Sequence, residues 1–561
     1  MAPPDGLRML GTWMARILGP ESKFISLALV YGAAISLLSL ATPISVQLLI
    51  NSVANTALPT PLFTLSGILF GLLLMASTLS ALRVHLMALF ERKLFARLMA
   101  EITLRSVHAQ NPFFLDVRRS DLFNRFFDLL TVQKALPSLL IGGFSILLQG
   151  VIGIVITSFY HPFFLAFNAC LVIALVTLWW VWAPGAVRTA IAKSHAKHAA
   201  AAWLESIGAS NGAYKSSRHL TYAIERSENA TANYVSLHKD HFRFTFRQTL
   251  CLLLLYATAS AALLALGGWL ILINELSVGQ LVAAELILSS VLYGVAQLGG
   301  YLENFYDLVA GLEELSLFWD LPQEPVPIAV GRGPLDGAFR FRDISFEGHL
   351  LDFAVSAGEQ LAVIAEPGTE RSVTMLLRRL SVPERGLISI GGADIAAFDM
   401  YQLRSAVMVL DGSSNVEMTA REYLTLACPE DHQGIIEAME LVGLGDRVGR
   451  LPKGLDTTLS ASGWPLSVQE TLALKLAGAL LAQPRVLILS SLYDLMPPAR
   501  VDKVLSRLKH CGTTVLQFTS RPEGLERAGW LWLGTRRQHR AGSLAELGRL
   551  LGQEKTDALS A

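Results

Sequence analysis

The chain has 561 residues, with 46 basic and 46 acidic side chains, so its formal net charge at neutral pH is zero. This balance excludes the basic footprint of a nucleic-acid-binding protein. Charged residues make up only 16% of the sequence, against roughly 25% in an average soluble protein. The four cysteines lie far apart and form no C-x-x-C pair, so we expect neither a disulfide framework nor a cysteine metal site.

Three stretches of about 55 residues, 24–82, 135–187 and 248–302, are almost free of charged side chains, and their only carboxylates are Glu275 and Glu285. Each stretch is long enough for two membrane-spanning helices of about 20–25 residues with a short turn between them. Helices are expected because backbone polar groups in hydrocarbon must be satisfied within the segment. The sequence therefore predicts six transmembrane helices in a lipid bilayer.

Lysine and arginine are absent from the three predicted turns, near 51–61, 160–161 and 274–279, and abundant in 83–134 and 188–247. Positively charged segments stay on the cytoplasmic side of a membrane. We therefore expect these two segments, and both termini, to be cytoplasmic. Both segments are longer than the bilayer requires, so the helices are expected to extend into the cytoplasm.

Beyond the membrane half, prolines and glycines mark a linker, after which short β-branched runs alternate with helical patterns. This alternation is typical of an α/β domain with a largely parallel sheet. The predicted strands are 339–346, 360–364, 405–410, 486–489 and 513–519, and the predicted helices are 371–380, 421–427, 435–442, 468–482 and 500–510. The predicted organisation is an α-helical membrane domain (1–320), a linker (321–335) and an α/β P-loop NTPase-like domain (336–561).

Residues 365–372, Ala-Glu-Pro-Gly-Thr-Glu-Arg-Ser, lie between a predicted strand and a predicted helix and form an altered phosphate-binding loop. An intact loop reads G-x-x-G-x-G-K-[ST], in which backbone N–H groups and the lysine hold the phosphates. Gly368 and Ser372 match this pattern. Glu370 replaces the last glycine and Arg371 replaces the lysine, so weak phosphate binding at Gly368, Arg371 and Ser372 is the most that we expect.

Together, six spans, two long cytoplasmic segments and the α/β domain resemble a half-transporter of the ATP-binding cassette (ABC) exporter family, with a type I exporter fold. Residues 111–125, beginning Asn-Pro-Phe-Phe-Leu-Asp, are similar to the family pattern P-x-x-F-F-D-x-x-R-x-G-E-L-x-x-R. In the family this segment holds a coupling helix that touches the nucleotide domain, and a second coupling segment follows later. The resemblance implies coupling roles for Asp116, Arg118, Arg119, Leu122 and Gly208.

The resemblance also implies ATP and Mg²⁺ as cofactors, although most residues that would serve them are replaced. The family's signature L-S-G-G-Q reads Leu466-Ser467-Val468-Gln469-Glu470, which keeps only the serine hydroxyl as a phosphate contact. Serines cannot hold Mg²⁺ or polarise water as carboxylates do, so we expect a degenerate nucleotide domain with no hydrolysis by this chain alone. At the other family positions, Asp411 replaces the glutamine, Ser490 the Mg²⁺-binding aspartate, Ser491 the general-base glutamate, Ser520 the switch histidine and Gly348 the aromatic residue that stacks on adenine.

Nucleotide domains of this family pair head to tail, so the resemblance implies a second half-transporter as a partner. A homodimer of this chain would have no competent site, which favours a heterodimer with an ATPase-competent chain in a bacterial inner (plasma) membrane. The cargo class stays open among peptides, proteins, lipids and small hydrophobic compounds. Two alternatives also stay open: a non-transporting membrane regulator or scaffold, and a conventional ATP-driven homodimeric exporter.

Two further sets of side chains in the membrane half are candidate sites. Glu285 lies within the sixth predicted span, where a carboxylate is costly enough to suggest a function. It is expected to line a cargo path or to pair with a polar group of a neighbouring span. His195, His198 and His219 lie in the second cytoplasmic segment, but no cysteine or tight ligand cluster accompanies them in sequence, so we expect no metal site there.

Overall fold

The computed structural model describes residues 6–39, 41–56, 60–110, 120–273, 275, 278–324, 331–412, 417–428, 432–523, 525, 527 and 529–560. The chain divides into two compact units, Met1–Glu324 and Pro325–Ala561. Asp116, Arg118 and Arg119, three of the expected coupling residues, lie outside the described residues. Each unit is described by itself.

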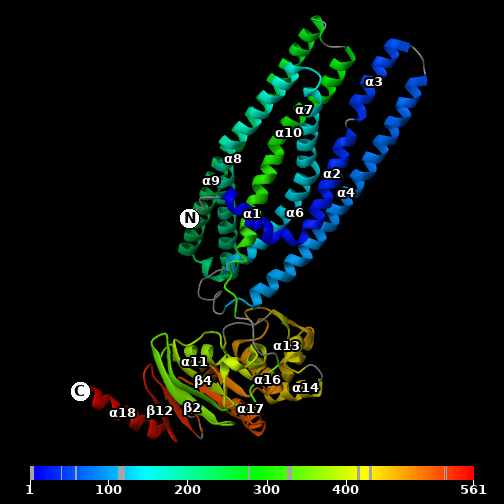
Figure 1. Ribbon diagram of the computed structural model, residues 1–561. Helices are drawn as coiled ribbons and strands as arrows, with labels where there is room; N and C mark the ends of the chain where they lie inside the picture. Colours follow the sequence, from blue (N-terminus) through cyan, green and yellow to red (C-terminus); the bar gives the residue numbers. More distant parts are fainter. Residues whose placement is uncertain are drawn as a thin grey trace. The chain divides into compact units, whose positions relative to one another are not determined.

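The first unit is a bundle of long helices (Figure 1), and among the described residues six are long and apolar enough to cross a membrane. This confirms the six predicted spans. Helices α4, α8 and α9 contain 48, 48 and 56 residues, well beyond the roughly 20 that a bilayer requires. The helices of this unit are α1 (Gly6–Ile17), α2 (Ser22–Ser39), α3 (Ala41–Thr56), α4 (Thr60–Val107), α6 (Asp128–Ser138), α7 (Phe144–Ser158), α8 (Pro162–Ala209), α9 (Ser217–Leu272) and α10 (Val278–Ser316).

The third span is interrupted by a π-helical turn, Leu139–Gly143, between α6 and α7. Pro137 lies in the last turn of α6, and because proline lacks an N–H it breaks the regular hydrogen-bond ladder there. Gly142 in this turn lies directly against Tyr301 of α10, since an added Cβ would lie 2.1 Å from the Tyr301 hydroxyl oxygen. A residue with a side chain at position 142 would therefore displace the Tyr301 ring.

The main hydrophobic core of this unit lies where α1, the C-terminal half of α4, α6, α8 and the end of α10 meet. Helix α1 was not predicted, because only one side of this 12-residue helix is apolar and the charge-free stretch begins after it. Trp13 and Ile17 of α1 are buried in this core. The short helix η2 (Ser120–Phe127) leads into α6 and contributes the buried Leu122.

The second unit is an α/β domain built on a six-stranded, mostly parallel sheet in the order β12-β11-β3-β10-β9-β6. A four-stranded antiparallel sheet, β2-β1-β4-β5, and a small β7-β8 pair accompany it. Figure 1 shows the strands of the two larger sheets with helices around them. The strands are β1 (Phe339–Phe346), β2 (His349–Val355), β3 (Gln360–Ala365), β4 (Arg385–Ile390), β5 (Ala393–Asp394), β6 (Val407–Leu410), β7 (Met418–Thr419), β8 (Thr458–Leu459), β9 (Val486–Leu489), β10 (Thr514–Phe518), β11 (Trp530–Leu533) and β12 (Gln538–Ala541).

All five predicted strands and all five predicted helices of this unit are present, with small shifts of their ends, and the predicted α/β class is confirmed. Strands β2, β4, β11 and β12 were not predicted. The helices are α11 (Thr369–Leu377), α12 (Met400–Ala406), α13 (Ala420–Ala427), α14 (His432–Leu441), α15 (Gly445–Gly449), α16 (Val468–Ala482), α17 (Pro498–His510) and α18 (Leu544–Ser560).

Strand β9 is buried along its whole length and pairs in parallel with β10 and β6, while β3 pairs in parallel with β10. The carboxyl ends of these strands therefore lie along one edge of the sheet. In open α/β sheets, ligands bind at that edge. The phosphate loop follows β3, Ser490 and Ser491 follow β9, and Ser520 follows β10 by two residues, so the sheet brings these predicted site residues to a common edge.

Candidate nucleotide-binding site

The altered phosphate loop keeps the backbone of a strand–turn–helix phosphate site. Gly368 has φ +90°, a left-handed conformation that glycine adopts without strain. The Thr369 N–H donates to the Glu366 carbonyl at 3.1 Å, and the Ser372 N–H donates to the Gly368 carbonyl at 3.1 Å, so α11 begins directly after the glycine. The predicted position of the loop between a strand and a helix is therefore correct.

A histidine lies over this loop. His349, the first residue of β2, is buried, and a Cβ added at Gly368 would lie 3.6 Å from its Cε1 atom. The Ser372 hydroxyl donates to the Gly368 carbonyl at 3.2 Å and lies 3.4 Å from His349 Nδ1. The hydroxyl that would face Mg²⁺ in an intact loop is thus engaged within the chain. His349 was not predicted as a site residue, because only the strand pairing of β2 brings it to the loop.

Three buried polar atoms near this edge form no hydrogen bond within the part of the chain that the structure describes. They are His349 Nε2, Thr369 Oγ1 and Ser490 Oγ. A buried polar atom without a partner costs free energy, so an ordered water or a small polar ligand would be favoured beside each of them.

Glu370 places a half-buried carboxylate at the start of α11. Burial raises its pKa, the negative charges of Asp411 and Asp494 raise it further, and a hydrogen bond from the Ser491 backbone partly offsets them. The neighbouring Arg371 contacts Met375 one turn along the same helix, with its Nε atom 3.4 Å from the sulfur. Glu370 therefore places a carboxylate at the position where an intact loop has a glycine.

The ends of β9 and β10 are joined by Asp494, another residue that sequence reasoning missed. Its carboxylate accepts hydrogen bonds from the Thr519 hydroxyl at 2.9 Å, from the Ser520 N–H at 2.8 Å and from the Ser520 hydroxyl at 3.0 Å. The Ser490 N–H donates to the Leu410 carbonyl at 3.2 Å. The serines at the predicted magnesium and switch positions thus support the strand ends.

Asp411 and Lys475 connect the neighbouring strand to α16. The Lys475 ammonium group donates to the Asp411 backbone carbonyl at 3.0 Å. Lys475 is buried, and this burial lowers its pKa. The Asp411 carboxylate lies close enough to raise the pKa of Glu370. The residue predicted at the family's glutamine position therefore lies near the altered loop.

Ser467 caps a helix. Its hydroxyl accepts a hydrogen bond from the Glu470 N–H at 3.3 Å, and the Glu470 carboxylate accepts one from the Ser467 N–H at 2.7 Å. Arg447 Nε donates to the other oxygen of Glu470 at 2.9 Å. The pattern S-x-x-E before an apolar run is a capping box, and this signal was available in the sequence.

No protein-family model matches this sequence. Among known proteins, the leukotoxin export ATP-binding protein of Aggregatibacter actinomycetemcomitans is 27% identical over 234 residues, and the alpha-hemolysin translocation ATP-binding protein of Escherichia coli O157:H7 is 28% identical over 237 residues. Each alignment covers 40% of this chain and only 33% of the relative. The solved structure of a bacterial Atm1-family ABC exporter with ATP bound superposes with a TM-score of 0.80 over 96% of this chain and 99% of that one, at 18% identity.

The fold is that of an ABC exporter. With its six candidate spans, the chain is a multi-pass membrane protein that combines the membrane and nucleotide domains of this fold.

Within this fold the cofactor would be Mg²⁺-ATP, and the side chains at the site do not fit it. Phosphoryl transfer requires a carboxylate to hold Mg²⁺ and a polar group to orient the attacking water, whereas the residues predicted for those two positions are the serines Ser490 and Ser491. Of the nearby carboxylates, Asp494 is occupied by Thr519 and Ser520, and Glu370 lies in the loop, where phosphate oxygens would need N–H donors. The retained backbone of the loop is compatible with an anion, so the obstacle lies in the side chains.

The remaining predicted site residues belong to the membrane half and are described within that unit. Leu122 is buried in the core of the helical unit, and Gly208 is exposed in the last turn of α8. Glu285 lies in α10 and accepts a hydrogen bond from the Ser289 hydroxyl at 2.9 Å. This partner lies one turn along the same helix, and the two roles expected for Glu285, lining a cargo path or pairing with a neighbouring span, stay predictions.

Proposed function

We propose that this chain is an ATPase-deficient half of a membrane exporter of the ABC type, driven by a partner subunit that carries a competent nucleotide domain. The observation that carries the proposal is the pairing of an export fold with a nucleotide site whose carboxylates are misplaced: Glu370 stands in the phosphate loop, while serines stand at positions 490 and 491. The membrane half supplies half of a translocation pathway.

Electrostatics supports the loss of nucleotide binding. A carboxylate about 4 Å from a phosphate oxygen, at an effective dielectric constant of about 20, opposes binding by about 4 kcal/mol, or about a thousandfold in affinity. Burial and the negative charges of Asp411 and Asp494 raise the pKa of Glu370, and the hydrogen bond from the Ser491 backbone partly offsets this rise. The same two aspartates add negative charge near the loop, which further opposes a phosphate.

In this proposal the motion comes from the partner's ATPase cycle and reaches the membrane helices through the two cytoplasmic segments. Residues 118–127 and 206–215, which include Leu122 and Gly208, are the proposed transmission elements. The two toxin-export relatives make a polypeptide the first cargo to test. A bacterial inner membrane is the proposed location, since both relatives are bacterial proteins.

The test is equilibrium binding of a fluorescent ATP analogue to the purified full chain, with and without Mg²⁺. The proposal predicts no saturation up to millimolar analogue. The matched variant carries Glu370→Gly and Arg371→Lys together, which restores two positions of the loop on the same backbone and should bind more tightly. Micromolar binding by the natural chain that is lost on Arg371→Ala would contradict the proposal.

The role of a partner is tested separately by co-expression with a half-transporter that has an intact phosphate loop. ATP hydrolysis should appear in the co-purified complex and should vanish when the partner's loop lysine is replaced by alanine. Hydrolysis that survives this replacement would place a working site in this chain.

A further inference from the structure

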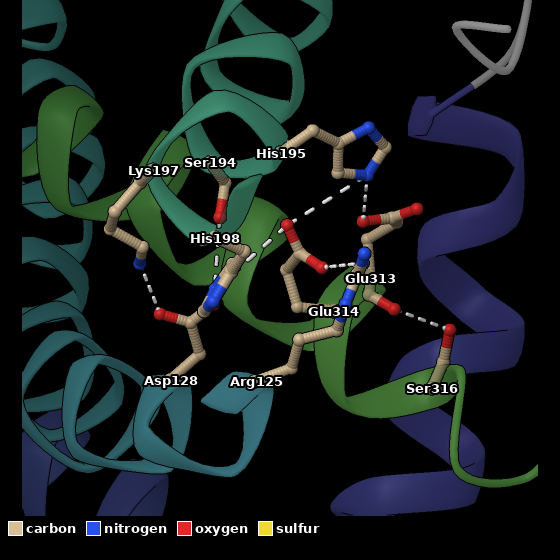
Figure 2. Close-up of polar contacts among 9 residues, drawn as sticks. All are labelled: Arg125, Asp128, Ser194, His195, Lys197, His198, Glu313, Glu314 and Ser316. Atoms are coloured by element: carbon tan, nitrogen blue, oxygen red, sulfur yellow. Dashed lines mark hydrogen bonds and ion pairs between the residues drawn. The ribbon is translucent and has the colours of Figure 1, made fainter. Parts of the chain in front are cut away.

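A cluster of charged and imidazole side chains lies where η2, α6, α8 and α10 meet (Figure 2). Its residues belong to the helical unit and lie outside the charge-free stretches 135–187 and 248–302. Figure 2 shows side chains from three separate parts of the sequence pointing toward one another. The members of this cluster, which we call the junction cluster, are Arg125, Asp128, Ser194, His195, Lys197, His198, Glu313 and Glu314.

Two imidazoles approach one carboxylate oxygen in the junction cluster. His195 Nε2 lies 3.8 Å from Glu314 Oε1, and His198 Nε2 lies 4.0 Å from the same atom. His198 Nε2 also lies 2.6 Å from Asp128 Oδ2. Because the two histidines are three residues apart on α8, they lie on the same face of the helix.

The oxygen between the two histidines has no hydrogen bond. Glu314 is completely buried, and Arg125 pairs with its other oxygen, Oε2. Glu314 Oε1 is buried and forms no hydrogen bond within the described residues. A buried carboxylate oxygen without a hydrogen bond is unfavourable, so an additional group that binds this oxygen would stabilise the cluster.

The charges of the junction cluster do not balance. Its three carboxylates face two permanent cations, Arg125 and Lys197, so one negative charge is uncompensated while both imidazoles are neutral. Each cation is engaged on the outer side: Lys197 with Asp128 Oδ1 and Arg125 with Glu314 Oε2. The inner oxygens, Asp128 Oδ2 and Glu314 Oε1, are left facing the histidines.

We propose that Asp128, His195, His198 and Glu314 bind a divalent transition-metal ion of the zinc type. Neutral imidazole nitrogens and carboxylate oxygens are ligands that Zn²⁺ takes at about 2.0–2.2 Å in a tetrahedral arrangement, which separates ligand atoms by about 3.4 Å. The ligand atoms of Asp128, His198 and Glu314 already lie within 4.8 Å of one another. The separations of 2.6 Å between His198 and Asp128, and of 3.8 and 4.0 Å from the two histidines to Glu314, each lie within about 1 Å of that spacing.

The outer contacts suit a metal site. Metal-binding carboxylates are usually held by further hydrogen bonds that fix their orientation. Here Lys197 and Arg125 hold one oxygen of each carboxylate and leave the other for the ion. Glu313 accepts a contact from His195 Nε2 at 2.9 Å, so on metal binding this imidazole nitrogen moves from Glu313 to the ion.

A metal in the junction cluster would join three helices at a defined point. Glu313 and Glu314 belong to the last turn of α10, and Ser316, which ends α10, donates from its hydroxyl to the Glu313 carbonyl at 2.7 Å. The ion would therefore fix the end of α10 to α6 and α8. The sequence analysis expected no metal site among the histidines, because the carboxylates are far away in sequence and only the fold brings them to the H-x-x-H pair.

His219, the third histidine weighed from the sequence, does not belong to this site. It is exposed, and its Nδ1 lies 2.6 Å from the Ala213 carbonyl oxygen. It provides a matched control on the same half of the chain.

The test uses the purified full chain, stripped of metal by a chelator and then titrated with Zn²⁺ against a chromophoric competitor, with elemental analysis of the product. The proposal predicts one ion per chain. His198→Ala and Glu314→Gln should each weaken binding by at least about a hundredfold, whereas His219→Ala should leave it unchanged. Co²⁺ bound to the natural chain should give the visible absorption of a tetrahedral site with nitrogen and oxygen ligands.

A variant that fails to fold is recognised by its gel-filtration profile, and the volume-conserving Asp128→Asn then replaces it in the comparison. Failure of the natural chain to bind Zn²⁺ would overturn the proposal. Binding that survives in both His198→Ala and Glu314→Gln, or that is lost equally in His219→Ala, would overturn it as well. None of these readouts depends on ATP or on transport.

Discussion

Replacing Arg125 by methionine in the metal-free chain would test how strongly the junction cluster depends on paired charges. Arg125 forms an ion pair with Glu314, whose carboxylate is completely buried and whose other oxygen has no hydrogen bond in the described chain. Methionine keeps the length and apolar character of the side chain but removes the charge. The variant would leave Glu314 as a buried carboxylate that has lost its principal cation.

The expected loss follows from this burial. Removing one partner of a buried ion pair typically costs about 3–5 kcal/mol, because the remaining charge stays in a medium of low polarity. At roughly 2 °C per kcal/mol for a large unit, the apparent Tm should fall by about 6–10 °C. The exposed pair Arg243–Asp240, with side chains 63% and 53% exposed and 3.6 Å apart, provides the contrast, since such pairs contribute about 0–1 kcal/mol.

The assay is thermal unfolding of the purified chain in detergent at a fixed scan rate, comparing Arg125→Met, Arg243→Met and the double variant Arg125→Met/Glu314→Gln. The double variant should recover most of the lost stability, because the uncompensated charge is removed with its partner. Equal Tm values for Arg125→Met and Arg243→Met would refute the reasoning. A double variant that is no more stable than Arg125→Met alone would also refute it.

Three further predictions concern the α/β unit. Glu370→Gly should raise the affinity for an ATP analogue by up to about a thousandfold, whereas Glu366→Ala on the same loop should not; equal effects would argue against a specific role for position 370. Ser467→Ala should lower the free energy of unfolding by about 1 kcal/mol and Ser467→Gly by only a few tenths, as measured by denaturant unfolding; no loss in either would mean that the capping box contributes nothing. The folded-state pKa of Glu370 is raised above its ordinary 4.5, so its ionisation destabilises the fold as pH rises through that pKa. Glu370→Gln should therefore raise the Tm at alkaline pH and leave the Tm unchanged below pH 4.5. A difference in Tm that does not depend on pH would contradict this prediction.

The large elements of this chain were predictable because their sequence signals are local. The charge-free stretches identify the spans without any tertiary information, and the buried run Val486–Leu489 with its flanking helices identifies a parallel strand. Strands β2 and β4 were missed because neither His-Leu-Leu-Asp-Phe-Ala-Val nor Arg-Gly-Leu-Ile-Ser-Ile alternates apolar and polar residues regularly. Helix α1 was missed because only one side of it is apolar. The core into which Trp13 and Ile17 of that side pack is formed by helices far away in sequence.

The candidate site was predicted only in part, for a similar reason. The replaced positions of the phosphate loop and of the strand ends could be located from motif spacing. His349 and Asp494 could not, since strand pairing and the η7 turn (Ser491–Leu495) bring them to the site. The junction cluster depends even more on the fold, because Asp128 and Glu314 are separated by most of the membrane half in sequence.

The measurement that tests the central claim most directly is phosphate release from Mg²⁺-ATP by the purified full chain, alone in lipid nanodiscs. The rate should equal that of the Arg371→Ala variant, because Ser490 and Ser491 supply neither a metal ligand nor a water-orienting carboxylate. Saturable hydrolysis by the natural chain that is abolished in Arg371→Ala would contradict the account and would make this chain a working ATPase.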